Sequence, residues 1–302
     1  MNPPIVHDGQ RPEALKAELL ASLKQGIVPP KFLYSSPRQS ELWLALHEQY
    51  APTESLQAPY LEAVPYLPIG LQSMIALGCG GGEKEIAMLQ AYEAPVTFTP
   101  SDVSPSLARL AASRAQDAGI ATGTPLVFDL AEAANIRETI HARSKSPRVF
   151  TFFGIIPNFR PPNILPQTRA LMDPEDYLIT SANLAPDGIN AILPQYDNAP
   201  TRCWLEQFLT EHNIANGELR ISTRSTSLLE WVQADYVFYH DTITEIGAAQ
   251  IRFEKGSALQ LFISHRYTPE SAVRTFGEFG IQVDKTFLSS NGEEGVFLCR
   301  PQ

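Results

Sequence analysis

The fold class is most clearly indicated by one stretch of the sequence, Ser73-Met74-Ile75-Ala76-Leu77-Gly78-Cys79-Gly80-Gly81-Gly82. Its first half, residues 73–77, is a short apolar run, and its second half is a glycine-rich turn. A segment with helical spacing of apolar side chains, including Ile86 and Leu89, follows. A buried strand, a glycine turn and a helix in this order are typical of a parallel α/β sheet.

The same alternation continues toward the C-terminus. The sequence predicts strands over 96–100, 125–128, 148–153 and 177–180, with helices over residues 104–119 and 131–141. Because strands joined through helices run parallel, we expect a mostly parallel, Rossmann-like sheet with helices on both faces. Residues 281–287 and 296–299, joined by Asn291-Gly292, predict an antiparallel C-terminal hairpin that completes this sheet.

Two regions fall outside the alternation. Residues 11–25 and 41–50 carry helical periodicity, whereas residues 236–239, 250–253 and 259–263 are rich in β-forming side chains. We therefore expect an α+β substrate lobe formed by residues 1–66 and by an insertion over 190–267. The Rossmann-like domain should then comprise residues 67–189 and be completed by residues 268–302.

Composition restricts the class of protein. The 33 acidic residues outnumber the 23 basic ones, for a net charge of −10, which disfavours binding to nucleic acids or to anionic lipids. The three cysteines are far apart and no histidines have metal-ligand spacing, so neither a disulfide framework nor a metal site is expected. No apolar run approaches the roughly 20 residues of a membrane helix, and we expect a cytoplasmic protein. The oligomeric state stays open, with a monomer slightly favoured.

Residues at the strand ends carry most of the functional information, because ligands of doubly wound sheets bind outside the carboxyl ends of the strands. These residues are the glycine loop 78–82, Asp102, Asp129 and Gly154. Asp102 can accept hydrogen bonds from ribose hydroxyls and Asp129 from an adenine amino group. Alternatively, residues 80–82 form only a tight turn, Asp102 only marks a helix entry, and Asp129 only caps the next helix.

The loop favours a ligand without phosphate at this position. A dinucleotide fingerprint needs glycine at position 83, where this chain has Glu83, and a carboxylate there would repel a pyrophosphate. A nicotinamide-dependent oxidoreductase is therefore the weaker hypothesis. S-adenosylmethionine (SAM) has the ribose and the adenine but no phosphate, and it fits this pattern.

Several motifs, in order, resemble the SAM-dependent histidine Nα-methyltransferases of ergothioneine biosynthesis. In the proposed sheet they are LGCGGGEK (77–84), SDVSPSLARLAASRA (101–115), FDL (128–130) and FFGIIPNFRP (152–161). Outside it they are PPKFLY (29–34), YAPTE (50–54), PQYDNA (194–199) and ISHRY (263–267). This resemblance implies a class I methyltransferase fold and SAM as the cofactor.

The resemblance also implies roles for individual residues. With the strand-end residues, it gives a cofactor-binding set: Gly78, Gly80, Lys84, Asp102, Asp129, Leu130 and Gly154. It places an amino-acid substrate among these residues: Tyr50, Asn158, Tyr196 and Ser264, with Tyr34 close by. We expect Asn158 and Tyr34 to orient the reacting amine, since an amide and a phenol can both donate and accept hydrogen bonds.

Two positions depart from the family pattern. Ala76 stands where the family has an acidic residue at the strand end, and Phe262 stands where it has a glutamate that holds the substrate imidazole. An apolar residue in place of that acceptor removes imidazole recognition. The sequence therefore predicts N-methylation of an amino acid or related small amine other than histidine, with Phe262 lining the substrate site. The alternative from another class is a non-catalytic methyltransferase-like module that serves binding or regulation.

Two further features are expected to carry little chemistry. His265, beside Ser264, is the one histidine near the proposed site, and we expect it to be a hydrogen-bonding surface group. The acidic pair Glu293-Glu294 is typical of a solvated hairpin tip.

Overall fold

The computed structural model describes residues 3–50, 57–226 and 229–302, and for residues 47–50 the backbone alone. The chain divides into two compact units. Unit 1 holds Met1–Arg11, Glu54–Pro186 and Tyr267–Gln302. Unit 2 holds Pro12–Thr53 and Asp187–Arg266. Each unit is therefore assembled from separate pieces of the chain.

Unit 1 is built on an eight-stranded sheet in the order β1-β4-β3-β2-β5-β6-β13-β12. Its strands are β1 (Ile5–Val6), β2 (Ser73–Leu77), β3 (Thr97–Asp102), β4 (Leu126–Val127), β5 (Arg148–Phe152), β6 (Tyr177–Asn183), β12 (Ile281–Leu288) and β13 (Glu294–Pro301). Strands β1 to β6 pair in parallel, and β13 pairs antiparallel with both β6 and β12. The predicted mostly parallel α/β sheet with an antiparallel C-terminal hairpin is confirmed.

The order of the strands places a ligand edge in the middle of the sheet. From β2 the chain proceeds to β3 and β4 on one side and then crosses to β5 and β6 on the other. Such a reversal leaves a crevice at the carboxyl ends of the two central strands, where ligands of doubly wound sheets bind. The glycine loop follows β2, so it lies at this reversal.

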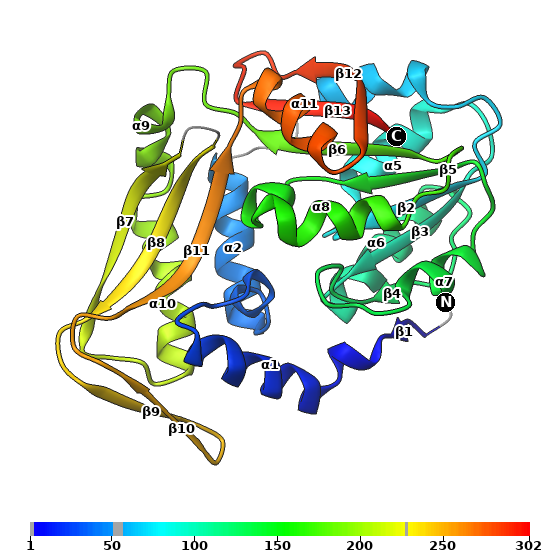
Figure 1. The fold of residues 1–302 in the computed structure, drawn as a ribbon. Coiled ribbons are helices and arrows are strands. Elements are labelled where there is room, and N and C mark those ends of the chain that lie inside the picture. Colours follow the sequence, from blue (N-terminus) through cyan, green and yellow to red (C-terminus); the bar gives the residue numbers. More distant parts are fainter. Residues whose placement is uncertain (1–2, 51–56, 227–228) are drawn as a thin grey trace. The chain divides into compact units, whose positions relative to one another are not determined.

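Helices cover both faces of the sheet. They are α4 (Ala58–Ala63), α5 (Glu83–Ala91), α6 (Pro105–Asp117), α7 (Ile136–His141), α8 (Pro161–Ala170) and α11 (Pro269–Glu278). Figure 1 shows α8 in front of the strands and α5 behind them. All residues of β2 and β5 are buried, because a parallel strand between two helical layers has no solvated face.

Unit 2 combines helices with antiparallel strands. The helices are α1 (Pro12–Lys24), α2 (Pro37–Tyr50), α9 (Ile189–Ile192) and α10 (Ala199–Glu211). Strands β7 (Gly217–Ser225), β8 (Glu230–Phe238) and β11 (Ala258–Arg266) form a three-stranded sheet, and β9 (Thr242–Ile246) pairs with β10 (Ala249–Phe253). The predicted strands over 250–253 and 259–263 lie inside β10 and β11, and the predicted strand over 236–239 overlaps the end of β8, which stops at Phe238. Strands β7 and β9 were not predicted.

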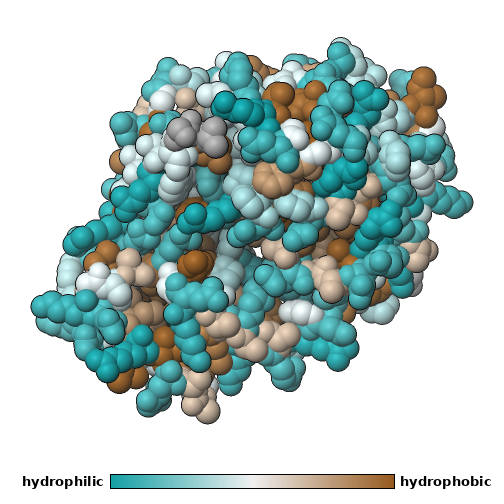
Figure 2. All heavy atoms as spheres, in the orientation of Figure 1, coloured by the Kyte–Doolittle hydropathy of each residue, from teal (hydrophilic) through white to brown (hydrophobic). Residues whose placement is uncertain are grey.

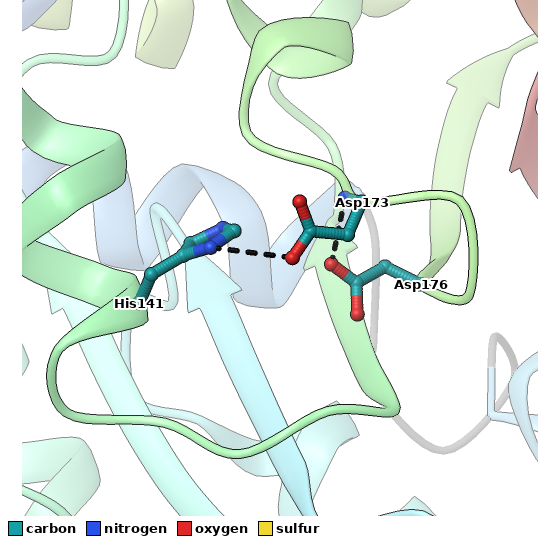
Figure 3. A group of neighbouring side chains, drawn as sticks. All are labelled: His141, Asp173 and Asp176. Carbon is teal, nitrogen blue, oxygen red and sulfur yellow. Dashed lines mark hydrogen bonds and ion pairs between the residues drawn. The ribbon is translucent and has the colours of Figure 1, made fainter.

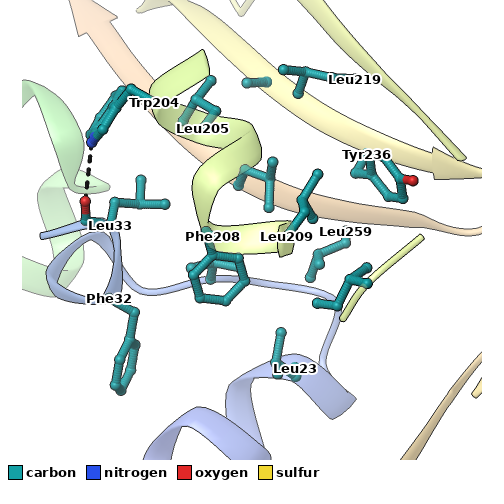
Figure 4. Close-up of a cluster of buried hydrophobic side chains, with 14 of the residues drawn as sticks. Leu23, Phe32, Leu33, Trp204, Leu205, Phe208, Leu209, Leu219, Tyr236 and Leu259 are labelled. Atoms are coloured by element: carbon teal, nitrogen blue, oxygen red, sulfur yellow. Dashed lines mark hydrogen bonds between the residues drawn. The ribbon is translucent and has the colours of Figure 1, made fainter. Parts of the chain in front are cut away.

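Helix α10 organises the core of unit 2. Its apolar side chains pack against α1, the 3₁₀ turn Pro30–Leu33 and the three-stranded sheet, as Figure 4 shows for these residues: Leu23, Phe32, Leu33, Trp204, Leu205, Phe208, Leu209, Leu219, Tyr236 and Leu259. The indole Nε1 of Trp204 donates to the carbonyl of Leu33 at 3.0 Å. A buried tryptophan needs such a partner, and this bond fixes the turn against the helix.

The boundaries of the units differ from the predicted domain boundaries. The expected substrate lobe began at residue 1 and its first part ended at residue 66, whereas unit 2 takes only Pro12–Thr53 from this region. Strand β1 pairs with β4 at the edge of the large sheet, and α4 contacts β12 and β13. Two-residue β1 has too little periodicity to be recognised, and helical spacing in α4 does not reveal which core it covers.

The face of the molecule drawn in Figure 2 is mainly polar. On the face drawn in Figure 2, hydrophilic side chains predominate and apolar ones form small separate patches, in keeping with the net charge of −10. None of the helices formed by the described residues has the length and apolar character that a bilayer crossing requires.

Candidate functional site

The glycine loop after β2 depends on its glycines. Gly78 and Gly80 have φ angles of +67° and +52°, a region that side chains other than glycine rarely adopt. A Cβ on Gly78 would overlap the Cδ1 of Ile155, whereas a Cβ on Gly80 would meet no atom within 4 Å. The backbone at Gly80 is thus bare on the side where a Cβ would stand, so a ligand can approach it closely.

Asp102 holds this loop in place from the end of β3. Its Oδ2 accepts the backbone N–H of Gly80 at 3.0 Å, and its Oδ1 accepts that of Ser104 at 2.9 Å. Burial raises the pKa of Asp102 to about 6, although these backbone hydrogen bonds lower it. An ionised carboxylate has about four acceptor positions, so two backbone donors leave it able to accept hydroxyl donors.

Asp129 closes a turn after β4. Its Oδ1 accepts the backbone N–H of Ala131 at 2.9 Å, and its side chain and that of Leu130 are both buried. The next helix, α7, begins at Ile136 with Asn135 at its N-cap, so Asp129 does not cap it. The predicted helix over 131–141 therefore starts later than expected, because the turn at Asp129 occupies its first residues.

Lys84 contacts two side chains, those of Tyr60 and Glu294, that were not predicted to lie near it. Its Nζ donates to the hydroxyl of Tyr60 at 2.7 Å and lies 3.6 Å from Oε1 of Glu294. The hydroxyl of Tyr60 in turn donates to Oε1 of Glu294. Glu294 is only 6% exposed, so its assignment to a solvated hairpin tip was wrong. The Asn291-Gly292 turn is indeed the tip, but Glu294 already belongs to β13, where it pairs with Asn183.

The end of β5 carries the next group of predicted residues. Gly154 has a φ angle of +70°, and its N–H donates to the hydroxyl of Ser181 on β6 at 2.8 Å. Asn158 ends the 3₁₀ turn Ile156–Asn158 and is half-buried. Among the described residues, its side-chain amide has no hydrogen-bond partner, so its donors and its acceptor are available to a ligand.

Unit 2 brings the other predicted side chains into one aromatic group. The rings of Tyr196 and Phe262 stack with centroids 6.0 Å apart, and Trp204 meets Phe262 edge-on at 5.6 Å. Tyr34 lies 5.5 Å from the ring of Trp204. Tyr34, Tyr196 and Phe262 are all half-buried, so this group presents an apolar aromatic surface.

Polar atoms lie beside the aromatic group. The hydroxyl of Tyr196 is 2.9 Å from Oγ of Ser264, and it accepts a hydrogen bond from Nη2 of Arg266 at 2.5 Å. Tyr50 is the last residue of α2, and its side chain lies outside the described residues, as does most of the YAPTE motif. His265 is buried rather than on the surface, with its ring 5.8 Å from that of Trp231.

A cluster of side chains at the amino ends of the strands resembles a metal site, but arginines already balance the charges of its carboxylates. His141, Asp173 and Asp176 lie together near the start of β6 (Figure 3). Asp176 accepts the backbone N–H of Arg148 at 2.9 Å, and the Arg148 guanidinium lies 3.1 Å from Asp173 and 3.3 Å from Asp176. Arg137 also pairs with Asp173. Arginine charges therefore occupy the carboxylates that a metal ion would need.

Three functional candidates were missed in the sequence: Tyr60, Glu85 and Glu294. Glu85 is buried on α5, and its Oε1 accepts the hydroxyl of Thr151 at 3.0 Å. Burial raises the pKa of Glu85 to about 7. A glutamate at i+1 from Lys84 in the first turn of a helix looks like an ordinary dipole-compensating residue, and only the fold shows that it faces the sheet.

The solved structures to which this chain is similar include methyltransferases. The mitomycin 7-O-methyltransferase MmcR is 14% identical to this chain, with a TM-score of 0.52. The alignment covers 97% of this chain and 69% of the MmcR chain. A SAM-dependent methyltransferase from Clostridium acetobutylicum is 10% identical to this chain, with a TM-score of 0.48. That alignment covers 86% of this chain and 97% of the other. At such identities the likeness to MmcR supports the fold alone. Comparison with curated proteins gives no match.

A family match covers almost the whole chain. Residues 15–301 match the family described as histidine-specific, SAM-dependent methyltransferases. The matched segment contains the glycine loop, Asp102 and the aromatic group of unit 2, and it extends far beyond a single motif. The chain therefore belongs to the histidine-specific, SAM-dependent methyltransferase family, and it is a SAM-dependent methyltransferase.

Proposed function

We propose that this enzyme methylates the amino group of an amino acid, or of a related small amine, whose side chain is aromatic or apolar, and that histidine is not its substrate. The observation that carries the proposal is the position of Phe262 in the aromatic group with Tyr196 and Trp204. An imidazole needs a hydrogen-bonding partner, and a phenyl ring offers none. An aromatic or aliphatic side chain instead gains contact area there.

The residues proposed to hold SAM are Gly78, Gly80, Lys84, Asp102, Asp129, Leu130 and Gly154. The bare backbone at Gly80 and the remaining acceptor positions of Asp102 support this set, because they suit a ribose that approaches the loop closely. Asp129 and Leu130 offer an acceptor and an apolar side chain at the end of β4, as an adenine requires. When bound, SAM supplies an electrophilic methyl group on a positively charged sulfur.

The chain's own part in methyl transfer is alignment and exclusion of water. An in-line displacement needs a neutral amine held at the correct angle, and it needs no covalent intermediate. We assign orientation of the amine to Asn158 and Tyr34, and binding of the remaining substrate to Tyr50, Tyr196, Phe262 and Ser264. The unpartnered side-chain amide of Asn158 supports its role, since it can accept from an amine and donate to a carboxylate.

The proposal is tested first by calorimetric titration with SAM and with S-adenosylhomocysteine. Transfer of a labelled methyl group is then measured for aromatic and aliphatic amino acids, their decarboxylated amines, and histidine. We expect an aromatic or aliphatic acceptor to have a kcat/KM at least about tenfold above that of histidine, the usual worth of one recognition contact. A preference for histidine would overturn the proposed specificity.

The role of Asn158 is tested with Asn158→Ala. This change should lower kcat/KM while the affinity for S-adenosylhomocysteine stays unchanged, because Asn158 is assigned to the amine. Asn163→Ala, an exposed asparagine in α8, is the matched control and should change neither quantity. Unchanged turnover in Asn158→Ala would remove Asn158 from the proposed site.

We further propose that unit 1 is the SAM-binding domain and unit 2 the substrate lobe, and that the enzyme works in the cytoplasm on small molecules rather than on nucleic acids. The net charge of −10 supports the choice of substrate class. Free cysteines, two buried and one exposed, suit a reducing compartment.

A further inference from the structure

A buried carboxylate lies under the ligand edge of unit 1. Glu85 is the third residue of α5, and it is only 3% exposed. Its Oε1 accepts the hydroxyl of Thr151, which is fully buried and stands one residue before the end of β5. The carboxylate therefore lies near the carboxyl end of β5, one of the two central strands at which the strand order reverses.

This position is next to the one at which β2 lacks an acidic residue. Ala76 and Thr151 are paired residues of the parallel strands β2 and β5, so their side chains point to the same face of the sheet. Helix α5 covers that face, because Ala76 shares a buried core with Met88 and Leu89 of this helix. An acidic side chain at position 76 would thus stand beside Thr151, where the carboxylate of Glu85 lies in this chain.

The titratable groups around Glu85 come from its own helix, the glycine loop, α4 and α6: Lys84, Glu83, Cys79, Tyr60 and Arg114. Lys84 lowers the pKa of Glu85, whereas Glu83, which pairs with Arg114, raises it. Burial raises the pKa values of Cys79 and Tyr60 well above the ordinary ones, so both groups stay protonated and neutral. The surroundings of Glu85 are therefore poor in positive charge.

The proposed site has to hold a positive charge at this place. The ribose of SAM is assigned to Asp102, at the end of β3, and the reacting amine to Asn158, which follows β5. Because the methyl group passes from the sulfur to this amine, the sulfur belongs between the two, at the ends of β2 and β5. SAM has a positively charged sulfur, whereas the product S-adenosylhomocysteine has an uncharged thioether. A carboxylate under these strand ends can distinguish the two by charge.

Such a carboxylate does not have to touch the ligand. The attraction between two charges falls only with the first power of their distance, and it is stronger where water does not screen it. Burial raises the pKa of Glu85 to about 7, so near neutral pH the ionised and protonated forms are close in free energy. A cation nearby favours the ionised form, and its binding should therefore release a proton from Glu85.

We propose that Glu85 takes the place of the acidic residue that β2 lacks at Ala76, and that its charge makes this enzyme bind SAM more tightly than S-adenosylhomocysteine. This inference rests on the proposed assignment of SAM to the edge of unit 1. Glu85 is then a specificity-determining residue that acts through its charge. The competing explanation is that Glu85 only ties α5 to β5 through Thr151, which an uncharged amide would do as well.

Calorimetric titration of the full-length protein with SAM and with S-adenosylhomocysteine separates the two explanations. The measured quantity is the ratio of the affinity for SAM to the affinity for S-adenosylhomocysteine. Because only the ionised form of Glu85 attracts the sulfonium, this ratio should rise with pH up to about 7 and level off above it. Titrations in buffers of different ionisation enthalpy should also show that SAM releases a fraction of a proton below about pH 7 and that S-adenosylhomocysteine does not.

Glu85→Gln is the first variant, and Glu93→Gln, at an exposed residue beyond the end of α5, is the matched control. At about pH 8, Glu85→Gln should lower the affinity ratio at least about fivefold, since the amide has no charge. Asp102 titrates in the same range, because burial raises its pKa to about 6. It is present in both proteins, so the difference between their pH profiles belongs to Glu85. Glu93→Gln should leave the ratio unchanged.

Thr151→Val is the second variant, and it decides the question if Glu85→Gln fails to fold. The hydroxyl of Thr151 lowers the pKa of Glu85, so its removal should move the levelling-off of the ratio to higher pH. A purely structural tie between α5 and β5 would not move it. Exchange of the two side chains, as Ala76→Glu with Glu85→Ala, should keep the preference for SAM, because the carboxylate then comes from β2.

The outcomes separate this inference from the proposed function on which it rests. If both ligands bind and Glu85→Gln has the affinity ratio of the unchanged protein at every pH, Glu85 does not set the preference for SAM. If the exchange variant folds but loses this preference, Glu85 does not stand in for an acidic residue at position 76. Binding of neither ligand to the unchanged protein contradicts the proposed SAM site itself.

Discussion

Among single residues, Phe262 is the one on which the proposed substrate specificity rests. Phe262→Glu returns a carboxylate to the place where the resemblance expects it. The ratio of kcat/KM for histidine to kcat/KM for the best apolar substrate should rise at least about tenfold, since a hydrogen bond to a charged group contributes about 1.5–3 kcal/mol. Competition between the two substrates measures the ratio, and Phe262→Leu, which stays apolar, is the control. An unchanged ratio in Phe262→Glu would show that Phe262 does not set the specificity.

Glu85 predicts a pH dependence of stability. Its folded-state pKa of about 7 lies above the ordinary 4.5, so the folded protein favours the protonated form. The stability from this group is complete below about pH 4.5 and is lost as the pH rises through 7. Two and a half pKa units correspond to about 3 kcal/mol.

Glu85→Gln removes this titration while its amide oxygen can still accept the hydroxyl of Thr151. The variant should be more stable than the unchanged protein at pH 8.5, by up to about 3 kcal/mol, and equal to it near pH 4.5. Urea unfolding at the two pH values gives both differences. If the two proteins have parallel pH profiles, Glu85 does not carry the effect.

Residue-scale reasoning from sequence found the glycine loop and Asp102, because their signals are local: glycines after a strand, and a carboxylate at the end of the next. It did not find the contacts of Lys84, since Tyr60 is 24 residues away and Tyr60 to Glu294 spans 234 residues. Periodicity carries no information on which side chains meet across such separations. For the same reason Glu294, beside a recognisable turn, was placed in solvent.

At the scale of elements, Asp176 joins the beginnings of β5 and β6. It is fully buried and accepts the backbone N–H groups of Arg148 and Asp173, both at 2.9 Å. Asp176→Asn removes one of the two carboxylates that lie against the buried guanidinium of Arg148, while Asp173 remains, so it should cost less than the about 3–5 kcal/mol of a fully broken buried pair. Chemical denaturation measures this change, and Glu175→Gln, at an exposed neighbouring residue, is the control.

The same cluster predicts the outcome of a metal test. Because Arg137 and Arg148 already pair with the two carboxylates, adding zinc, or removing metals with a chelator, should leave the melting temperature unchanged. A rise of several degrees with zinc would show that the ion displaces the arginines. Patterns within single elements could not predict this cluster, because its members lie on α7, β5 and the turn before β6.

At the scale of the whole molecule, the two units depend on chain pieces that are far apart in sequence. The core of unit 2 combines Leu23, Phe32 and Leu33 with α10 and the three-stranded sheet. A fragment of residues 187–266 lacks these side chains, so we expect it to be unfolded by itself and to gain structure when a peptide of residues 12–53 is added. Circular dichroism with and without the peptide tests this expectation, and a folded fragment would contradict it.

The succession of strands and helices along residues 73–183 was predictable, because alternation and glycine turns repeat along the sequence. The boundaries between the two units were harder to predict from the sequence. Residues 1–11 join unit 1 through the two residues of β1, and α4 covers β12 and β13 rather than unit 2. Such choices depend on which apolar surface lies nearby once the chain has folded, and a local pattern does not contain that information.

The interleaved units also have a consequence for biosynthesis. The apolar side of α1 is synthesised long before β11, which contributes to the same core and is complete only at Arg266. At about 5–20 residues per second, the wait is roughly 10–50 s. During that time the apolar side of α1 lacks part of its core, and β6, once synthesised, has no partner on one side until β13 follows. Unit 2 can therefore close only after β11 has been synthesised, and the sheet of unit 1 only after β13, so chaperones that shield apolar segments should bind this chain while it is being made.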